Sequence, residues 1–270
     1  MAHKLVLAGA ALVCALMVSP YARALNPALD VSQYAHTSWK IRDGFTKGQI
    51  SSIVQTPDGY LWLGTEFGLL RFDGIRPVFW QPPGDQHLPS NNILSLLAGS
   101  DGTLWIGTYK GLASWKDGQL AQYAELDGQF IFKILEDHEG TVWAGSYHVP
   151  AGRLCSIQRG RVQCYGEDGS LGVGVVGLYE DREGNLWAGV SSGLWRLRPG
   201  PPRFYPLPGQ PNGIQVIGED ADGTLLVEGK VGIHRFAEGK TGAYELPAAV
   251  PQFRATRILR DHDGGLWIGQ

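Results

Sequence analysis

Short hydrophobic runs alternate with glycine-rich turns along most of the chain. In the first such stretch, "ISSIVQ", "YLWLG", "GLLRF" and "PVFWQ" are rich in β-branched and aromatic residues, and Gly, Pro or Asp bounds each of them. No apolar pattern with helical spacing is sustained over a window of about 11 residues. The pattern predicts short β-strands joined by tight turns, with four strands in this first unit.

The same unit recurs along the chain at intervals of about 41 residues. An acidic-Gly pair precedes a tryptophan slot, and a glycine follows the slot in five of its six copies. The slot holds Trp62, Trp105, Trp143, Trp187, Leu226 and Trp267. We expect the acidic-Gly pair to close the hairpin between the first two strands, where Gly supplies a positive φ. We expect the tryptophans to pack between neighbouring sheets.

A single four-stranded meander cannot bury both of its faces, but copies arranged around an axis can cover one another. The repeats therefore predict an all-β fold, a β-propeller of four-stranded antiparallel blades. About five and a half blades are present, because the sixth copy stops at "LWIGQ", and we expect the ring to be incomplete. The fifth copy departs from the pattern with Leu226 and Glu228.

The first two dozen residues have the layout of a secretory signal peptide. Lys4 precedes an apolar run from Leu5 to Val18, and Ala22-Arg23-Ala24 ends the segment. We therefore expect residues 1–24 to be a signal peptide and the mature chain to be exported. Residues 25–45 form an N-terminal segment in which 34–41 is a candidate closing strand, and residues 46–270 form the blades.

Composition and motifs restrict the function. The formal net charge is −3 and no basic run stands out, which argues against nucleic acid as a partner. No catalytic constellation or nucleotide fingerprint occurs, so we expect no catalytic residues and no cofactor. The "DADG" at Asp220 and "DHDG" at Asp261 lack the remaining ligands of a calcium loop, and no metal is expected. His138 and His262 occupy turn positions where solvated side chains are expected.

The two cysteines beyond the signal segment lie in "RLCSIQRGRVQCY". A two-residue turn at Arg159-Gly160 would place Cys155 opposite Cys164, in a non-hydrogen-bonded pair whose Cα atoms approach to about 4.5 Å. That spacing and an oxidising compartment predict a disulfide. Two free thiols, or a longer turn that shifts the register, remain the alternative.

Connections between strands two and three, and between blades, gather on one face of a propeller, opposite the Asp-Gly turns. Such a loop face is where a rigid scaffold presents binding residues. Tyr109, Lys110, Tyr147 and His148 are the candidate ligand-binding residues there, because aromatic and mixed polar groups suit sugar rings or peptides.

The unit "I-x-x-I-x-x-x-x-D-G-x-L-W-I-G-T-x-x-G-L-x-x-F/W" resembles the two-component regulator propeller repeat, and the resemblance extends from about Ser32 to Gln270. It implies the ligand-sensing input region of a bacterial receptor, at the periplasmic face of the inner membrane, within a longer chain. A histidine kinase output, a homodimer formed through regions outside this chain and an oligosaccharide ligand are what the resemblance favours.

Three alternatives stay open on the residues alone: a sensor region whose output is a diguanylate cyclase, an exported propeller enzyme acting on polysaccharide, and a scaffold for protein contacts.

Overall fold

The computed structural model describes most of the repeat region. The chain divides into two units between Ser38 and Trp39. The described residues are 38–40, 42, 44–45, 48–207, 213–228, 232–237, 239–246, 253–260 and 265–269. The expected signal peptide lies outside them. So does most of the candidate closing strand, of which residues 38–40 are described and are not in a strand.

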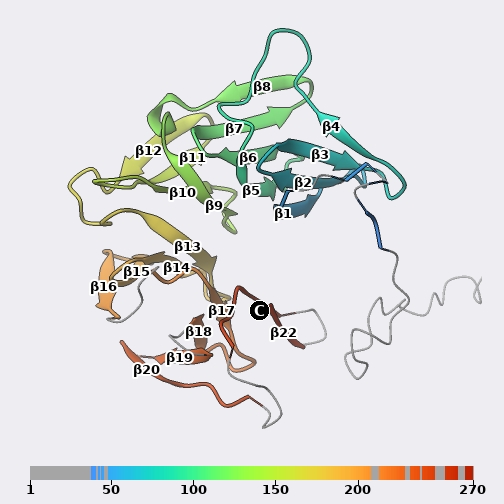
Figure 1. Ribbon diagram of the computed structural model, residues 1–270. Coiled ribbons are helices and arrows are strands. Elements are labelled where there is room, and N and C mark those ends of the chain that lie inside the picture. The colour runs from blue at the N-terminus through green and yellow to red at the C-terminus, as the bar shows by residue number, and fades with distance from the viewer. Residues whose placement is uncertain are drawn as a thin grey trace, which may run out of the picture. The chain divides into compact units, whose positions relative to one another are not determined.

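The described chain folds into antiparallel sheets whose strands follow one another in sequence order (Figure 1). The first three sheets consist of β1 (Ile50–Gln55), β2 (Leu61–Thr65), β3 (Gly68–Phe72) and β4 (Pro77–Trp80); β5 (Ile93–Ala98), β6 (Leu104–Thr108), β7 (Gly111–Lys116) and β8 (Gln119–Gln122); and β9 (Phe130–Glu136), β10 (Val142–Tyr147), β11 (Leu154–Gln158) and β12 (Arg161–Tyr165). The later sheets consist of β13 (Val175–Glu180), β14 (Leu186–Val190), β15 (Gly193–Arg198) and β16 (Arg203–Pro206); β17 (Ile217–Glu219), β18 (Leu225–Glu228), β19 (Ile233–Ala237) and β20 (Lys240–Ala243); and a two-stranded pair, β21 (Arg257–Arg260) and β22 (Leu266–Gly269). A short 3-10 helix, Ala124–Leu126, follows the second sheet.

The first strands of successive sheets contact one another. β1 contacts β5, β5 contacts β9, β9 contacts β13, β13 contacts β17, and β17 contacts β21. This is the arrangement of propeller blades, and the fold class that the repeats predict is confirmed. Among the described residues these contacts end at the sixth sheet without returning to β1, so the ring is not closed.

The repeated tryptophans are buried between sheets. Trp62, Trp105, Trp143 and Trp187 are each less than a tenth exposed. Trp105, for example, packs with Ile131 and Val142 of the following sheet. Burying a large aromatic side chain of this kind stabilises the fold by roughly 2–3 kcal/mol.

The indole N–H groups also hold the turns. Trp62 Nε1 donates to Thr56 Oγ1 over 2.9 Å, and Trp143 Nε1 donates to Asp137 Oδ2 over 2.6 Å. In the fifth sheet Leu226 replaces the tryptophan. There the first turn residue, Asp220, accepts hydrogen bonds from Arg235, Tyr244 and Arg260 instead.

A carboxylate clamp joins three pairs of neighbouring sheets. The first strand of the later sheet ends in a glutamate, which accepts a hydrogen bond from the backbone N–H of a residue in the preceding sheet's first turn. The pairs are Ser100 with Glu136, His138 with Glu180, and Arg182 with Glu219. Each turn residue adds a side-chain contact, such as Ser100 Oγ donating to Glu136 Oε1 over 2.6 Å.

The clamp is missing between the first and second sheets, where Pro57 and Ala98 occupy its two positions. Proline has no N–H to donate, and alanine has no carboxylate to accept. Both halves of the interaction are therefore lost together, and an open cavity of about 470 Å³ lies beside the two residues.

The two cysteines face each other across β11 and β12. Gln158 pairs with Arg161 and Cys155 pairs with Cys164, which is the register that a two-residue turn sets. Arg159 and Gly160 both have positive φ, as that turn requires. A disulfide with a Cα–Cα distance of 4.0 Å joins Cys155 and Cys164.

Candidate aromatic binding site on the loop face

The loop face carries a hollow lined by residues of three consecutive sheets, and its aromatic rings come from the second and third of the chain's sheets. Tyr109 and Tyr147 occupy the same position of the repeat, two residues after the repeated glycine of the second strand, and Ser191 occupies it in the fourth sheet. All three line one cavity of about 370 Å³. The repeat therefore places equivalent side chains around a shared hollow.

A threonine hydroxyl builds the turn that presents Tyr109. Thr108 Oγ1 donates to the carbonyl oxygen of Gly111 over 2.9 Å and accepts from the backbone N–H of Lys110 over 3.1 Å. Gly111 has a φ of 142°, which L side chains rarely adopt. These bonds close the turn and leave Tyr109 at its tip, with 43% of the residue exposed.

Strand β9 supplies the next two rings through a β-bulge. Ile131 pairs with Ser146 while Lys133 pairs with Gly145, so Phe132 is the extra residue between them. A bulge redirects the side chains beside it. Phe132 lines the cavity, and so does Val176, the corresponding extra residue of β13.

The rings form a stack across the hollow. Phe130 lies with its centroid 3.9 Å from that of Tyr109, at an interplanar angle of 21°. Tyr147 continues the stack 6.3 Å from Phe130, at 15°. Phe132 meets Tyr147 edge-on at 5.9 Å. Such faces suit the flat side of a sugar or aromatic ring.

The remaining lining is uncharged. Val173, Gly174 and Val176 line it together with the polar side chains of Ser191 and Gln215. None of the described residues that line the cavity carries a charge at neutral pH. An uncharged ligand with a flat apolar face and a few hydrogen-bonding groups matches this surface best.

Two of the four candidate residues do not line the cavity. Lys110 is exposed in the same turn as Tyr109 and contributes its backbone, whose carbonyl accepts from Gly128 N–H over 3.1 Å. His148 donates its backbone N–H to Val173 and sets its ring edge-on to Phe130 at 6.4 Å. His148 therefore contacts the aromatic stack through Phe130 without lining the cavity, and Lys110 shares the turn of Tyr109 without lining it.

Charged groups lie next to the cavity lining. The backbone N–H of Gln215 donates to Glu228 Oε1 over 3.1 Å, and burial raises the pKa of Glu228. Burial also lowers the pKa of Lys133 to about 8, and the charge of Arg257 adds to this effect. Lys133 follows Phe132 directly, so a titratable amine adjoins the aromatic site.

Phe130 and Phe132 were not among the residues expected to bind. Their signal is the "FIF" at the start of the first strand of the third unit, where two large rings lie two residues apart. Strand alternation alone would place both rings on one face of the sheet. The direction in which the Phe132 side chain points depends on the bulge, and no sequence pattern predicts that bulge.

The described part of the chain has neither a metal-binding cluster nor a membrane-spanning helix. No group of three or more His, Cys, Asp or Glu side chains gathers there in a way that could hold a metal ion. No helix there has the length and apolar character needed to cross a membrane.

Comparison with known proteins identifies the repeat. The family model described as two component regulator propeller matches residues 44–67, 87–110 and 125–148. The second and third matches contain all four candidate ligand-binding residues. No curated protein matches the chain significantly.

Solved structures share the fold at low sequence identity. The extracellular domain assigned to a hybrid two component system of B. thetaiotaomicron superposes with a TM-score of 0.68 at 19% identity, covering 86% of this chain and 34% of that one. One assigned to a one component system of the same organism gives 0.62 at 20% identity, covering 83% and 32%. Virginiamycin B lyase from Staphylococcus aureus gives 0.63 at 17% identity, covering 82% and 77%.

This chain spans about a third of the length of the two extracellular domains. All three structural matches establish the propeller fold. The match to the family model is more specific, because it identifies the type of repeat from the sequence. Residues 44–67, 87–110 and 125–148 are therefore identified as two component regulator propeller repeats.

Proposed function

We propose that this chain is the periplasmic ligand-sensing input region of a bacterial transmembrane signalling protein of the histidine kinase type. Its ligand binds in the aromatic cavity on the loop face. The observation that carries this proposal is the stack of Tyr109, Phe130 and Tyr147 along one cavity. The turn after β6, the start of β9 and the end of β10 bring these three rings together.

The chemistry of the cavity favours an uncharged oligosaccharide. Sugar rings present apolar C–H faces that pack on aromatic rings, while Ser191 and Gln215 offer hydrogen bonds to hydroxyl groups. The family match and the extracellular domains with the same fold support a sensor role. A homodimer that changes its packing when ligand binds would carry the signal to the output.

An enzymatic role finds less support at this site. Hydrolysis or elimination on a polysaccharide requires a positioned acid and base. The described lining of the cavity offers two tyrosines and a serine but no carboxylate or histidine. The lyase that shares the fold matches at 17% identity, which bears on the propeller alone.

Strains that carry Tyr147→Ala or Tyr109→Ala in the chromosomal gene test the proposal. We expect wild-type cells, compared with a deletion strain, to change transcription when supplied with an oligosaccharide from a panel of polysaccharide digests. Both variants should lose that response. Phe79→Ala is the matched control, because it removes an exposed ring from β4 of the first sheet.

Two outcomes would overturn the proposal. A normal response in both tyrosine variants, with protein present at wild-type level, would exclude the cavity as the binding site. The absence of any difference between wild-type and deletion strains across the panel would exclude oligosaccharide sensing.

A further inference from the structure

A second and larger cavity opens between the third and fourth sheets. Its volume is about 710 Å³, within the range of small-molecule sites. None of the residues that line it lines the loop-face cavity, so the two sites are distinct. The third sheet contributes Trp143, Leu154, Cys164 and Tyr165, the segment after β12 contributes Gly166, Glu167, Asp168, Ser170 and Leu171, and the fourth sheet with its last loop contributes Trp195, Leu197, Arg198 and Pro202.

Two other pairs of sheets show what fills the equivalent place. Trp80, Tyr165 and Tyr205 occupy one position of the repeat, each beside the slot tryptophan of its own sheet. A ring of the following sheet covers two of them. The ring centroid of Trp115 lies 5.0 Å from that of Trp80, and the ring centroid of Phe236 lies 5.3 Å from that of Tyr205. Both contacts are edge-on, so the space beside these aromatic side chains accepts a ring.

The fourth sheet has no ring at the position that would cover Tyr165. Trp115 and Phe236 each lie four residues after the glycine of the preceding turn, and Leu197 holds that position in the fourth sheet. Tyr165 is 43% exposed as a result, whereas Tyr205 is 9% exposed. The space that a ring of the protein fills in two other sheets is therefore open to a ligand here.

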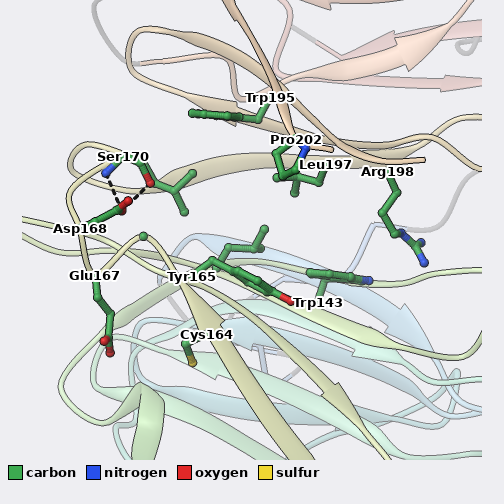
Figure 2. A pocket seen from close by; sticks show the side chains of 13 residues that line it. Trp143, Cys164, Tyr165, Glu167, Asp168, Ser170, Trp195, Leu197, Arg198 and Pro202 are labelled. Carbon is green, nitrogen blue, oxygen red and sulfur yellow. Dashed lines mark hydrogen bonds between the residues drawn. The ribbon is translucent and has the colours of Figure 1, made fainter. Parts of the chain in front are cut away.

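Apolar groups surround this open space. The ring of Tyr165 lies 6.3 Å from that of Trp143, centroid to centroid, at an angle of 24°. Figure 2 shows Trp195 across the cavity from these two rings. Leu154 and Leu171 add aliphatic side chains to the lining. The hydroxyl groups of a sugar would find few partners on such a surface, so an aromatic ring matches it better.

A carboxylate stands at one end of the cavity. Asp168 Oδ1 accepts the side-chain hydroxyl of Ser170 over 2.6 Å and the backbone N–H of Ser170 over 3.0 Å, and these bonds lower the pKa of Asp168. Asp168 is therefore ionised at neutral pH. No cation pairs with it among the residues that the structure describes, whereas Oε1 of neighbouring Glu167 lies 3.4 Å from Arg153 Nη2. The charge of Asp168 is available to a cationic ligand.

The other end of the cavity holds a cation whose charge is already compensated. Figure 2 shows Arg198 on the opposite side of the cavity from Asp168. The Nη atoms of Arg198 donate to Asp137, Glu139 and Glu180. Three carboxylates thus surround one guanidinium, and an anionic ligand would gain little from it. The charges around the cavity therefore favour a cationic ligand over an anionic one.

We propose that this cavity binds an arylalkylamine, a compound with one aromatic ring and a protonated amino group on a short aliphatic chain. Its ring takes beside Tyr165 the place that Trp115 and Phe236 fill in other sheets. Its ammonium group reaches Asp168, which lies three residues after Tyr165 in the chain. The apolar lining selects the ring, and the carboxylate selects the positive charge.

Three probes of nearly equal shape test the proposal. Phenethylamine carries the ammonium group, phenethyl alcohol is its neutral counterpart, and hydrocinnamate carries a carboxylate instead. Titration of the whole chain at neutral pH, followed by ligand-observed NMR, should show phenethylamine bound about three- to fivefold more tightly than phenethyl alcohol, as expected for one solvent-exposed ion pair. Hydrocinnamate should bind more weakly than the alcohol. Raising the NaCl concentration to about 0.5 M should reduce the preference for the amine.

A variant of Asp168 tests the charge. Asp168→Asn removes the charge and keeps an oxygen that accepts from Ser170. It should lower the affinity for phenethylamine to that for phenethyl alcohol and leave the affinity for the alcohol unchanged. Asp85→Asn is the matched control, because Asp85 is an exposed carboxylate in the loop after the first sheet. This control should keep the preference for the amine.

Variants of the ring position assign the binding to this cavity. Tyr165→Ala should weaken all three probes at least about threefold through lost ring contacts, while Tyr165→Phe should bind them as the wild type does. Leu197→Trp supplies the ring that the fourth sheet lacks and should block binding. Tyr147→Ala on the loop face should leave all three affinities unchanged, which separates this site from the proposed sensor site. Far-UV circular dichroism verifies the fold of each variant.

Several results would overturn the proposal. These are failure of phenethylamine to bind at millimolar concentration, equal affinity of the wild-type chain for phenethylamine and phenethyl alcohol, and a preference for the amine that Asp168→Asn leaves intact. Binding that Tyr147→Ala removes but Tyr165→Ala does not would assign the probes to the loop face and would also contradict it.

Discussion

The indole Nε1 of Trp187 donates a 2.8 Å hydrogen bond to Oδ2 of Asp181, the residue that begins the turn between β13 and β14. Asp181 Oδ1 also accepts the backbone N–H groups of Glu183 and Asn185. One carboxylate thus connects the turn to the ring buried between sheets. The repeated tryptophan therefore acts through its N–H as well as through its apolar area.

The first prediction compares two tryptophans of the repeat. Trp187→Phe removes apolar area and the bond to Asp181. Trp105→Phe removes similar area, but the corresponding turn residue is Gly99, which offers no side chain. We expect Trp187→Phe to lower the free energy of unfolding by about 1.5–3 kcal/mol more than Trp105→Phe, because a hydrogen bond to a charged group contributes roughly that much. Urea denaturation measures both. Equal losses would show that the N–H contributes nothing.

The second prediction concerns the clamp between the third and fourth sheets. His138 Nδ1 lies 2.6 Å from Glu180 Oε1, and this contact raises the pKa of His138. Because the folded pKa exceeds the unfolded value of about 6.5, the stabilisation is complete below that value and is lost as pH rises through the folded pKa.

His138→Gln measures the contribution of this contact. The difference in unfolding free energy between wild type and variant should be larger at pH 5.5 than at pH 9. A difference that stays constant, or one that grows with pH, would contradict the assignment.

The third prediction concerns Lys133 beside the aromatic site. Burial lowers the pKa of Lys133 from 10.5 to about 8 in the fold. Between these values the unfolded chain holds a proton that the folded chain has released, so this residue makes stability rise with pH. Lys133→Met should remove that rise and should stabilise the protein at pH 7 by roughly 1–3 kcal/mol. Urea denaturation of both proteins between pH 7 and 10.5 measures the free energy of unfolding at each pH. Parallel plots of that free energy against pH for the two proteins would contradict the prediction.

The fourth prediction restores the missing clamp between the first two sheets. Pro57→Ser supplies a backbone N–H and a hydroxyl, and Ala98→Glu supplies the carboxylate. Either change alone leaves its group without the other half of the clamp. The double variant should show a favourable coupling free energy of about 0.5–1.5 kcal/mol in a double-mutant cycle. Strict additivity of the two single changes would mean that the sheets are too far apart to form the clamp.

The fold was predictable because each unit repeats its own signals. Asp58, Asp101 and Glu139 each precede a glycine at the same distance from a tryptophan, and such regularity identifies the hairpins without knowledge of tertiary contacts. The register of Cys155 and Cys164 followed from local turn geometry in the same way. Tyr109 and Tyr147 were singled out because both come from the connection that follows a second strand, and their role in ligand binding stays a prediction.

Other features depend on contacts between residues about 40 positions apart. His138 was expected to be a solvated turn residue, and its bond to Glu180 arises because neighbouring sheets meet at that point. Phe132 is directed into the site by a bulge, and the cavity beside Tyr165 exists because the next sheet provides no covering ring. Neither a bulge nor an unfilled space has a pattern of its own in the sequence.

Hydrogen–deuterium exchange tests the central claim, that the loop face binds the ligand, most directly. The wild-type chain would be measured with and without the oligosaccharide digest that elicits the transcriptional response. We predict slower exchange at 109–110, 130–132, 147–148 and 173–176, with no change in those segments in Tyr147→Ala. Protection confined to the Asp-Gly turns on the opposite face, or identical exchange with and without the digest, would contradict the account.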